Sequence, residues 1–277
     1  MANQLSGGAP ARDMTSEIQK TQFLELSNGV KIAYHHSPGI SPGVVFLGGF
    51  KSDMTGSKAM ALDTHCSKEG RAFLRFDYQG HGQSSGNFVD GSIGQWAADA
   101  ISAFDHLTQG PQILVGSSMG GWIMLLMALQ RPSRVAGLIG LAAAPDFTED
   151  LMWDAFTDNQ RSAIEVNGKL EIPNCYDDEA PYTISRHLIE EGRNQLLLRD
   201  AIDLKMPVRL IQGMQDEDVP WQTAHRIMDQ ISGPDVEVQF VKDGDHRLSR
   251  PQDLRRLCCT LDGFVEHIVN PALPAES

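Results

Sequence analysis

One stretch of the chain decides its fold class, and it reads Ile113-Leu114-Val115-Gly116-Ser117-Ser118-Met119-Gly120-Gly121-Trp122. It holds the pattern Gly116-x-Ser118-x-Gly120 between an apolar run typical of a buried strand and a run typical of a helix. In such a strand-to-helix turn the serine backbone is strained, and side chains at the glycine positions would collide with neighbouring backbone. The turn exposes the serine hydroxyl at the carboxyl edge of a sheet, so we expect Ser118 to be a nucleophile.

Two other interpretations of this stretch stay open. Ser117 is the neighbouring candidate nucleophile, but it does not have the glycine spacing that Ser118 has. The stretch is also compatible with a glycine-rich turn in which the serine only caps a helix. Its position between a strand and a helix, together with the pair Gly120-Gly121, favours Ser118 as the nucleophile.

A serine hydroxyl needs a base, and the base needs a group that orients it. With a strand-to-helix turn of this kind, the partners follow along the chain in the order serine, acid, histidine. Asp216 stands just after the predicted strand 208–211, and His246 stands just after the predicted strand 236–241. Because the carboxyl ends of parallel strands meet at one edge of a sheet, we expect both side chains to lie near Ser118. His246 is therefore the expected base and Asp216 the expected acid.

Other acids and histidines fit these roles less well. Asp218 is the rival acid, but it lies further from the strand end and is expected to shape the turn. His81, in a Gly-rich turn after the predicted strand 72–76, precedes the serine, against the expected order, and is interpreted as a turn former. His35 and His36 are adjacent in a predicted strand, where their side chains point to opposite faces, so we expect no metal site there.

The charge that develops on a reacting carbonyl oxygen needs two backbone N–H donors. One is expected from the residue after the nucleophile, Met119, and the other from the loop after the third strand. That loop reads Gly48-Gly49-Phe50-Lys51, and we expect Phe50 to supply the second N–H group. An ordinary turn between a strand and a helix is the alternative interpretation of this loop.

Apolar strands alternate with amphipathic helices along most of the chain. The eight predicted strands are 23–26, 30–36, 44–47, 72–76, 113–115, 135–141, 208–211 and 236–241. The predicted helices are 59–67, 93–107, 122–129, 224–231 and 253–268. Continuous apolar strands between helices indicate an α/β fold, with a mostly parallel sheet and helices on both faces. Asn28-Gly29 is a hairpin signal, so the first two strands are expected to be antiparallel edge strands.

The alternation breaks between residues 146 and 205, a span too long for a plain loop. It carries helical stretches and four aromatic residues that need a surface to cover, namely Trp153, Phe156, Tyr176 and Tyr182. We interpret the span as a short helical cap insertion over the mouth above Ser118, where it forms an apolar slot.

The cap also carries arginines among many acids. Arg186 is the expected substrate-binding residue if the substrate bears a carboxylate, because it follows a run that should pack toward the mouth. The alternative is that Arg161, Arg186 and Arg193 are all solvated surface charges, which would offset Glu165, Glu190 and Glu191.

Composition limits the possible partners. The 277 residues are 41% hydrophobic and carry a formal net charge of −13, which disfavours nucleic acid and anionic membrane surfaces. No apolar run approaches the length of a membrane span. Residues 1–20 are interpreted as a flexible leader without features of a signal peptide, and residues 21–277 as one domain with the cap inserted. We expect a cytoplasmic protein that is a monomer or a homodimer.

The four cysteines are Cys66, Cys175, Cys258 and Cys259. They contain no C-x-x-C pair, and we interpret them as reduced thiols that pack as small apolar groups. Neither a metal nor a cofactor is expected.

These segments together resemble the α/β-hydrolase superfamily from about residue 23 to residue 268. The most specific strings are Arg75-Phe76-Asp77-Tyr78, the stretch 116–122, Gly213-Met214-Gln215-Asp216 with Val219-Pro220-Trp221, and Asp245-His246-Arg247. They look like the branch of mitochondrial acyl-glucuronide esterases and palmitoyl-protein thioesterases. The resemblance implies the α/β-hydrolase fold, a carboxylic ester or thioester substrate, and a catalytic triad of Ser118, Asp216 and His246. The chain differs from the animal members in having no evident transit peptide.

The sequence thus predicts a serine hydrolase that forms an acyl-enzyme on Ser118. Its expected substrate is a small acyl ester or thioester, or an acylated protein. Two alternatives stay open, namely another reaction on the same fold (amide or C–C bond hydrolysis, or perhydrolysis) and a non-catalytic binding protein. A serine at this position argues against epoxide hydrolases and dehalogenases, which generally use an aspartate nucleophile.

Overall fold

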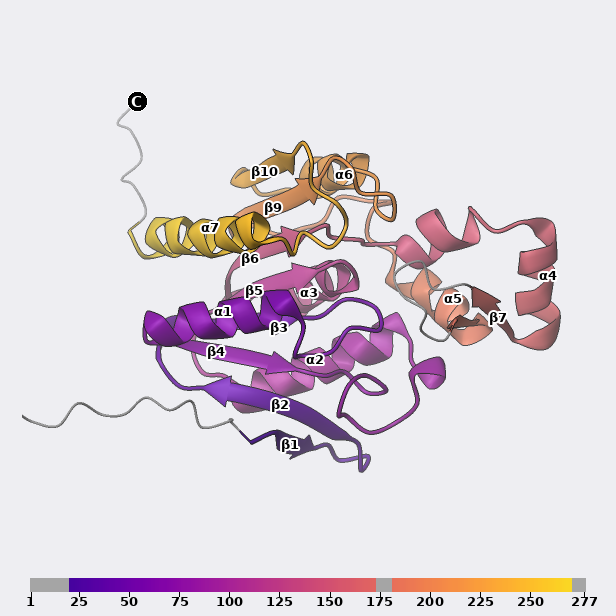
Figure 1. Cartoon of the computed structure of the whole chain (residues 1–277), viewed down its shortest axis with the longest axis horizontal. Helices are drawn as coiled ribbons and strands as arrows, with labels where there is room; N and C mark the ends of the chain where they lie inside the picture. The colour runs from indigo at the N-terminus through magenta and orange to yellow at the C-terminus, as the bar shows by residue number, and fades with distance from the viewer. Residues whose placement is uncertain (1–19, 173–180, 271–277) are drawn as a thin grey trace, which may run out of the picture.

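A computed structural model describes residues 20–172 and 181–270, so the predicted leader, Cys175 and Tyr176 lie outside the described residues. Eight strands form one sheet, in the order β1-β2-β4-β3-β5-β6-β9-β10 (Figure 1). Their bounds are β1 (Gln22–Glu25), β2 (Lys31–Ser37), β3 (Ile40–Leu47), β4 (Arg71–Phe76), β5 (Gln112–Ser117), β6 (Val135–Leu141), β9 (Val208–Gly213) and β10 (Val236–Val241). The predicted eight-stranded sheet is therefore confirmed.

The strand directions make the sheet mostly parallel, as predicted. β2 is antiparallel to both β1 and β4, and the other neighbouring pairs are parallel. One detail differs from the expected pair of edge strands. β1 lies at the edge, whereas β2 has a hydrogen-bonded neighbour strand on each side because it also pairs with β4 through Tyr34 to Ser37.

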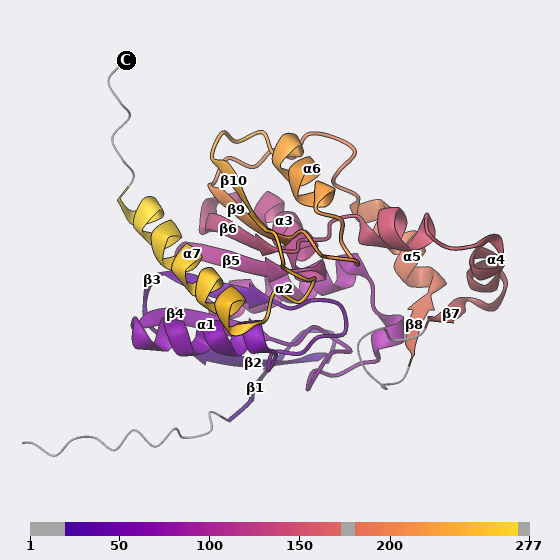
Figure 2. The ribbon, with the colours of Figure 1, turned by 45° about the horizontal axis from the view of Figure 1, so that its top comes forward.

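Helices cover both faces of the sheet. α1 (Ser57–Lys68) and α7 (Pro251–Val269) lie side by side on one face, in front of the strands in Figure 2. α2 (Ile93–Leu107), α3 (Met119–Gln130) and α6 (Gln222–Gln230) pack on the opposite face. The fold is thus an α/β sandwich of three layers, with one hydrophobic core on each side of the sheet.

β5 shows why these strands read as continuous apolar runs. It is buried along its whole length. Ile113 and Val115 pack into the core under α1 and α7, while Leu114 packs into the core on the side of α2 and α3. Because successive side chains point to opposite faces and both faces are covered, every position after Gln112 is apolar or small.

The elements of residues 148–172 and 182–192, within the span 146–205, project beyond the carboxyl ends of the parallel strands (Figure 1). The span contains a π-helical turn (Thr148–Trp153), α4 (Asp158–Asn167), β7 (Lys169–Ile172), β8 (Tyr182–Ser185) and α5 (Arg186–Gly192). β7 and β8 pair in antiparallel fashion, so the span is not purely helical as expected. Strands of four residues are too short for their alternation to stand out in the sequence.

Asp146 ties the two ends of this span together. Its backbone has φ 62° and its carboxylate is fully buried. The carboxylate accepts the N–H groups of Leu197 at 2.7 Å and Leu198 at 2.9 Å, and Nη1 of Arg199 at 3.2 Å. Because an unmade hydrogen bond at a buried group is costly, these bonds fix the base of the cap against the strand ends.

Candidate active site

Ser118 lies in the turn between β5 and α3, and its backbone is in a left-handed conformation with φ 54° and ψ −119°. The glycines around it are required by close contacts. A Cβ atom at Gly120 would lie 2.1 Å from the carbonyl oxygen of Leu47, and one at Gly116 would lie 2.4 Å from the carbonyl oxygen of Gly120. Such distances are far below van der Waals contact, so the G-x-S-x-G spacing follows from how tightly β3, β5 and α3 approach one another.

Three side chains predicted from separate parts of the sequence meet at this turn. Ser118 Oγ lies 3.1 Å from His246 Nε2. His246 Nδ1 lies 2.9 Å from Asp216 Oδ2 and 3.1 Å from Asp216 Oδ1. An ionised carboxylate only accepts hydrogen bonds, so the imidazole proton belongs on Nδ1 and Nε2 is left to accept the serine proton.

The Asp216 carboxylate is held by more than the histidine. Its side chain is fully buried, and it accepts N–H groups of Asp218 at 3.0 Å and Val219 at 2.8 Å. Gln212, at the end of β9, donates its Nε2 to Oδ2 at 2.9 Å. Asp218, the rival acid, is exposed and contributes its backbone to the turn, in keeping with the turn-shaping part expected of it.

Gln212 was missed by the sequence reasoning. Its side chain is almost completely buried, and its amide also reaches the carbonyl oxygen of Val219 at 3.1 Å. The one available signal was a polar residue at the end of the otherwise apolar stretch Leu210-Ile211, just before the turn that carries Asp216.

The two segments expected to supply the N–H donors both lie beside the serine. Met119 begins α3, where the first N–H groups have no partner inside the helix. In the loop after β3, a Cβ atom at Gly49 would lie 3.4 Å from Ser118 Cβ, so the loop passes directly over the serine. The ring of Phe50 is fixed by edge contacts to Phe88 at 4.8 Å and to Phe147 at 5.7 Å.

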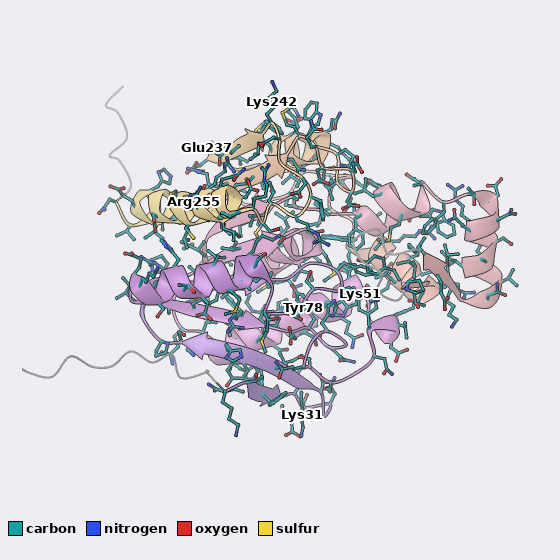
Figure 3. The ribbon with its side chains drawn as sticks, in the orientation of Figure 1. Lys31, Lys51, Tyr78, Glu237, Lys242 and Arg255 are labelled. Atoms are coloured by element: carbon teal, nitrogen blue, oxygen red, sulfur yellow. The ribbon has the colours of Figure 1, made fainter. Side chains whose placement is uncertain are left out.

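His81 supports this loop from below. Its Nε2 accepts the N–H of Lys51 at 3.3 Å, and its Nδ1 donates to the carbonyl oxygen of Gln79 at 3.3 Å. Tyr78 donates its hydroxyl to the carbonyl oxygen of Gly48 at 3.3 Å, and Figure 3 labels Tyr78 and Lys51 near the carboxyl ends of the strands. Burial lowers the pKa of His81 to about 4, so the ring stays neutral and keeps its acceptor at ordinary pH.

A cavity of about 510 Å³ opens over Ser118 and His246. The cap side of its lining is apolar, with Phe147, Leu151, Met152 and Tyr182. Of the four aromatic residues expected over the mouth, Tyr182 lines the cavity. Phe156 is buried in the core, and Trp153 is partly buried and packs against the same core. Tyr176 lies outside the described residues.

Arg186 lies away from the cavity, contrary to the expected contact with substrate. It is the first residue of α5, its side chain is 53% exposed, and its Nε pairs with Glu190 at 2.9 Å one helical turn later. Arg161 and Arg193 pair with Asp158 and Glu149. These positions match the alternative of solvated surface charges, so the substrate-binding role of Arg186 is not proposed again.

One group of side chains has the composition of a metal site. Asp216, Asp218 and His246 place one ligand atom each within 4.8 Å of one another, the one such group found in residues 20–172 and 181–270. His246 Nδ1 and Asp216 are already bonded to each other in this group. A metal ion there would have to break that bond, so these residues fit a proton-transfer role better than a metal-binding one.

Comparisons with known proteins bear on the class of this protein. A family model described as "Serine aminopeptidase, S33" matches residues 43–170. The chain is 40% identical to palmitoyl-protein thioesterase ABHD10, mitochondrial, from Mus musculus, over 89% of this chain and 82% of that protein. The structure of mouse α/β hydrolase domain-containing protein 10 matches with a TM-score of 0.84 at 40% identity, covering 90% of this chain and 99% of that one. A putative hydrolase from Agrobacterium vitis S4 also gives 0.84, at 38% identity over 89% and 99% of the two chains.

The fold, the turn at Ser118 and these matches define one class, and the chain belongs to the α/β-hydrolase family. Within that family its similarity to ABHD10 extends over most of both chains, which confirms the branch that the sequence resembles. The ABHD10 relatives are named as mitochondrial, and the cytoplasmic location expected here stays a prediction. In the part of the chain that the structure describes, no helix has the length and apolar character to cross a membrane.

Replacing Gly120 with alanine is expected to destabilise the protein by about 2 to 3 kcal/mol, because the new methyl group would overlap the backbone of Leu47. Chemical denaturation measures this change. Gly263→Ala is the matched control, since no atom lies within 4 Å of a Cβ there and a helical glycine-to-alanine change stabilises by roughly 0.5 to 1 kcal/mol. If the Gly120→Ala protein were as stable as the wild type, the new methyl group would not overlap the backbone of Leu47 as expected.

His81 is expected to make stability depend on pH. Its pKa in the folded protein is about 4, below the ordinary value of 6.5, so the unfolded chain takes up the proton first as the pH falls. The stability contributed by the neutral ring is therefore complete above pH 6.5 and is lost toward pH 4, with about 2 kcal/mol gone by pH 5.

Denaturant midpoints of wild type and His81→Gln between pH 5 and pH 8 test this expectation. The variant has no ring at position 81 to take up a proton, so it should lose less stability on acidification than the wild type. His35 and His36 are common to both proteins, so their contributions cancel in the comparison. His225→Gln, on the exposed side of α6, should follow the wild type. Equal slopes for wild type and His81→Gln would show that His81 does not carry the effect.

Proposed function

We propose that this protein is a serine hydrolase that cleaves carboxylic esters or thioesters through an acyl-enzyme on Ser118. The observation that carries the proposal is the hydrogen-bonded series from Ser118 through His246 to the buried Asp216, at the floor of a cavity. The relatives named as palmitoyl-protein thioesterases support thioesters, including that of an acylated protein, among the substrates.

In the proposed acylation step, His246 Nε2 takes the proton of Ser118 while Oγ attacks the substrate carbonyl. The 3.1 Å separation of the two atoms suits this transfer. Asp216 keeps the imidazole in the required tautomer and stabilises its positive charge after the transfer. The N–H groups of Asp218, Val219 and Gln212 keep the carboxylate oriented toward the imidazole.

The negative charge on the carbonyl oxygen is then stabilised by the N–H groups of Met119 and Phe50. His246 gives its proton to the leaving alcohol or thiol, which departs and leaves the acyl group on Ser118. Water activated by the same imidazole attacks the acyl-enzyme and releases the carboxylic acid. The apolar lining by Phe147, Leu151 and Met152 suits the acyl chain.

Amide cleavage is the second candidate, because the matching family model is described as a serine aminopeptidase. A panel of p-nitrophenyl esters of increasing chain length, acyl thioesters and an aminoacyl p-nitroanilide separates the two. We expect the esters and thioesters to be hydrolysed far faster than the anilide. Absence of turnover on all of them would favour a non-catalytic binding protein.

Ser118→Ala is expected to abolish labelling by a fluorophosphonate probe and to reduce ester turnover by roughly 10⁴-fold or more, since the nucleophile is gone. Gel fluorescence and a p-nitrophenyl ester assay measure both effects. Ser117→Ala is the matched control and should keep its labelling, because His246 bonds to Ser118. Labelling that survives in Ser118→Ala and is lost in Ser117→Ala would move the nucleophile to Ser117.

Asp216→Asn is expected to lower kcat by roughly 10⁴-fold with little change in KM, because an amide no longer fixes the correct tautomer of His246. Asp218→Asn is the control, and its cost should be far smaller since only its backbone N–H enters the hydrogen-bonded series. Steady-state kinetics on one ester compare the two variants. The reverse ranking would assign the role of the acid to Asp218.

A further inference from the structure

Part of the apolar wall of the cavity is carried by a short turn of the cap. Leu151 and Met152 line the cavity, and both belong to the π-helical turn Thr148–Trp153. The N–H of Asp154 donates to the carbonyl of Glu149, five residues earlier, at 2.9 Å, as a π-helical turn requires. Such turns are rare and are frequently found at functional sites. The contacts that hold this turn in place decide where the apolar wall lies.

The two ends of the turn are fixed by their neighbours in the chain. Asp146, just before it, accepts the hydrogen bonds at the base of the cap, and Phe156, just after it, is buried in the core. The turn also packs against α5. Leu151 and Met152 lie between these ends and are only partly buried. The middle of the turn therefore depends on a further contact.

Asp150 connects the middle of the turn to two arginines from different parts of the chain. Its Oδ2 accepts Nη1 of Arg199 and Nη1 of Arg226, each at 3.0 Å, and its Oδ1 accepts Nη2 of Arg199. Arg199 also reaches Asp146 at the base of the cap, whereas Arg226 belongs to α6 in the body of the protein. Asp150 thus ties the turn to a helix that lies 76 residues further along the chain.

This tie should be stronger than an ordinary ion pair on a protein surface. An isolated exposed pair contributes little, but the Asp150 side chain is only 17% exposed and is shared by two guanidinium groups. Burial raises the pKa of the Asp150 carboxyl, and the hydrogen bonds from Arg199 and Arg226 outweigh burial and hold that pKa below its usual value. The carboxylate is therefore ionised at neutral pH, and both pairs persist there.

Asp150 and the apolar wall are on different sides of the turn. Neighbouring residues of a helix do not face each other, so Asp150 can meet the arginines while Leu151 and Met152 face the cavity. Asp150 itself does not line the cavity. Release of its carboxylate would let the turn move and displace the wall, whereas the proposed triad is held by the strand ends of the body.

We propose that Asp150 is a positioning residue whose bonds to Arg199 and Arg226 hold Leu151 and Met152 against the acyl group of the substrate. The inference rests on the proposed function and adds to it a residue outside the cavity that sets the place of the apolar wall. An octanoyl chain makes more contact with such a wall than an acetyl group does, so loss of the tie should affect the longer chain more.

The ratio of kcat/KM for p-nitrophenyl octanoate to kcat/KM for p-nitrophenyl acetate measures this effect. Asp150→Asn should lower the ratio about 4-fold to 15-fold, the loss expected when one or two methylene groups lose their apolar contact. The change should be in KM for the octanoate rather than in kcat, because the wall contacts the chain equally in the ground state and the transition state. Asp150→Glu keeps the charge and should recover part of the loss.

Asp105→Asn is the matched control. Asp105 also pairs with two arginines, Arg131 at 2.7 Å and Arg134 at 3.5 Å, and none of the three lines the cavity. This variant should leave the ratio unchanged within about twofold, since 1.4 kcal/mol corresponds to a tenfold change and no apolar contact is lost.

Two further variants separate positioning from a general loss of stability. Asp150→Asn should still fold, since Arg199 keeps its bond to Asp146 and Arg226 is half-exposed. Arg226→Gln removes only the tie to α6 and should lower the ratio in the same direction. Leu151→Ala combined with Asp150→Asn should lower the ratio by less than the product of the two single effects, because both changes act on the same wall. Independent effects that multiply would contradict the proposal.

Calorimetry of Ser118→Ala with octanoate, the released acid, separates this inference from the proposed function because it needs no turnover. The added Asp150→Asn change should weaken octanoate binding by the same factor, and the added Asp105→Asn change should not. An unchanged ratio in Asp150→Asn, or an equal loss for both esters, would overturn the inference while the hydrolase assignment stands. If the wild type hydrolysed neither ester, the proposed function would fail and calorimetry would still decide on Asp150. Octanoate binding no tighter than acetate binding would also overturn the inference, because the wall would then not hold the chain.

Discussion

The left-handed backbone of Ser118 is unfavourable for a residue with a side chain, and the surrounding contacts must hold it. Its N–H donates to the carbonyl of Leu141 at 2.9 Å, and its carbonyl accepts the N–H groups of Gly121 at 2.8 Å and Ala144 at 3.1 Å. The first and last of these partners are at and just beyond the end of β6. The strained turn is therefore clamped by the neighbouring strand as well as by the helix that follows it.

The register of the sheet brings the other two side chains to the same place. β9 and β10 are parallel, with Gly213 opposite Val241, so both strands end at one level. The N–H of Met214 donates to the carbonyl of Val241 at 2.9 Å and keeps the two following loops together. Asp216 and His246 are in these loops, a few residues beyond the strand ends. Sheet geometry thus does most of the positioning, and short local hydrogen bonds complete it.

The fold and much of the candidate site could be predicted from the sequence, because both depend on local patterns. Buried parallel strands read as apolar runs, and the strand-to-helix turn needs glycines at fixed spacing. The contact between Gln212 and Asp216 and the pairing of β7 with β8 leave no comparable pattern. The surface position of Arg186 was missed for a related reason. It depends on which way the first turn of α5 faces, and the spacing to Glu190 alone does not say whether the pair is over the mouth or on the far side.

The two sides of the cavity come from different parts of the fold. The apolar side is carried by the cap, whose base is fixed through Asp146 and whose helix α5 packs against α2. The polar side is carried by α1 and by the loop after β10, which belong to the packed body of the protein. Changes in the cap can therefore alter the apolar lining without removing the bonds among Ser118, His246 and Asp216. In the proposed function, selection of the acyl chain is therefore left to the inserted cap, while the reacting side chains are held by the body of the protein.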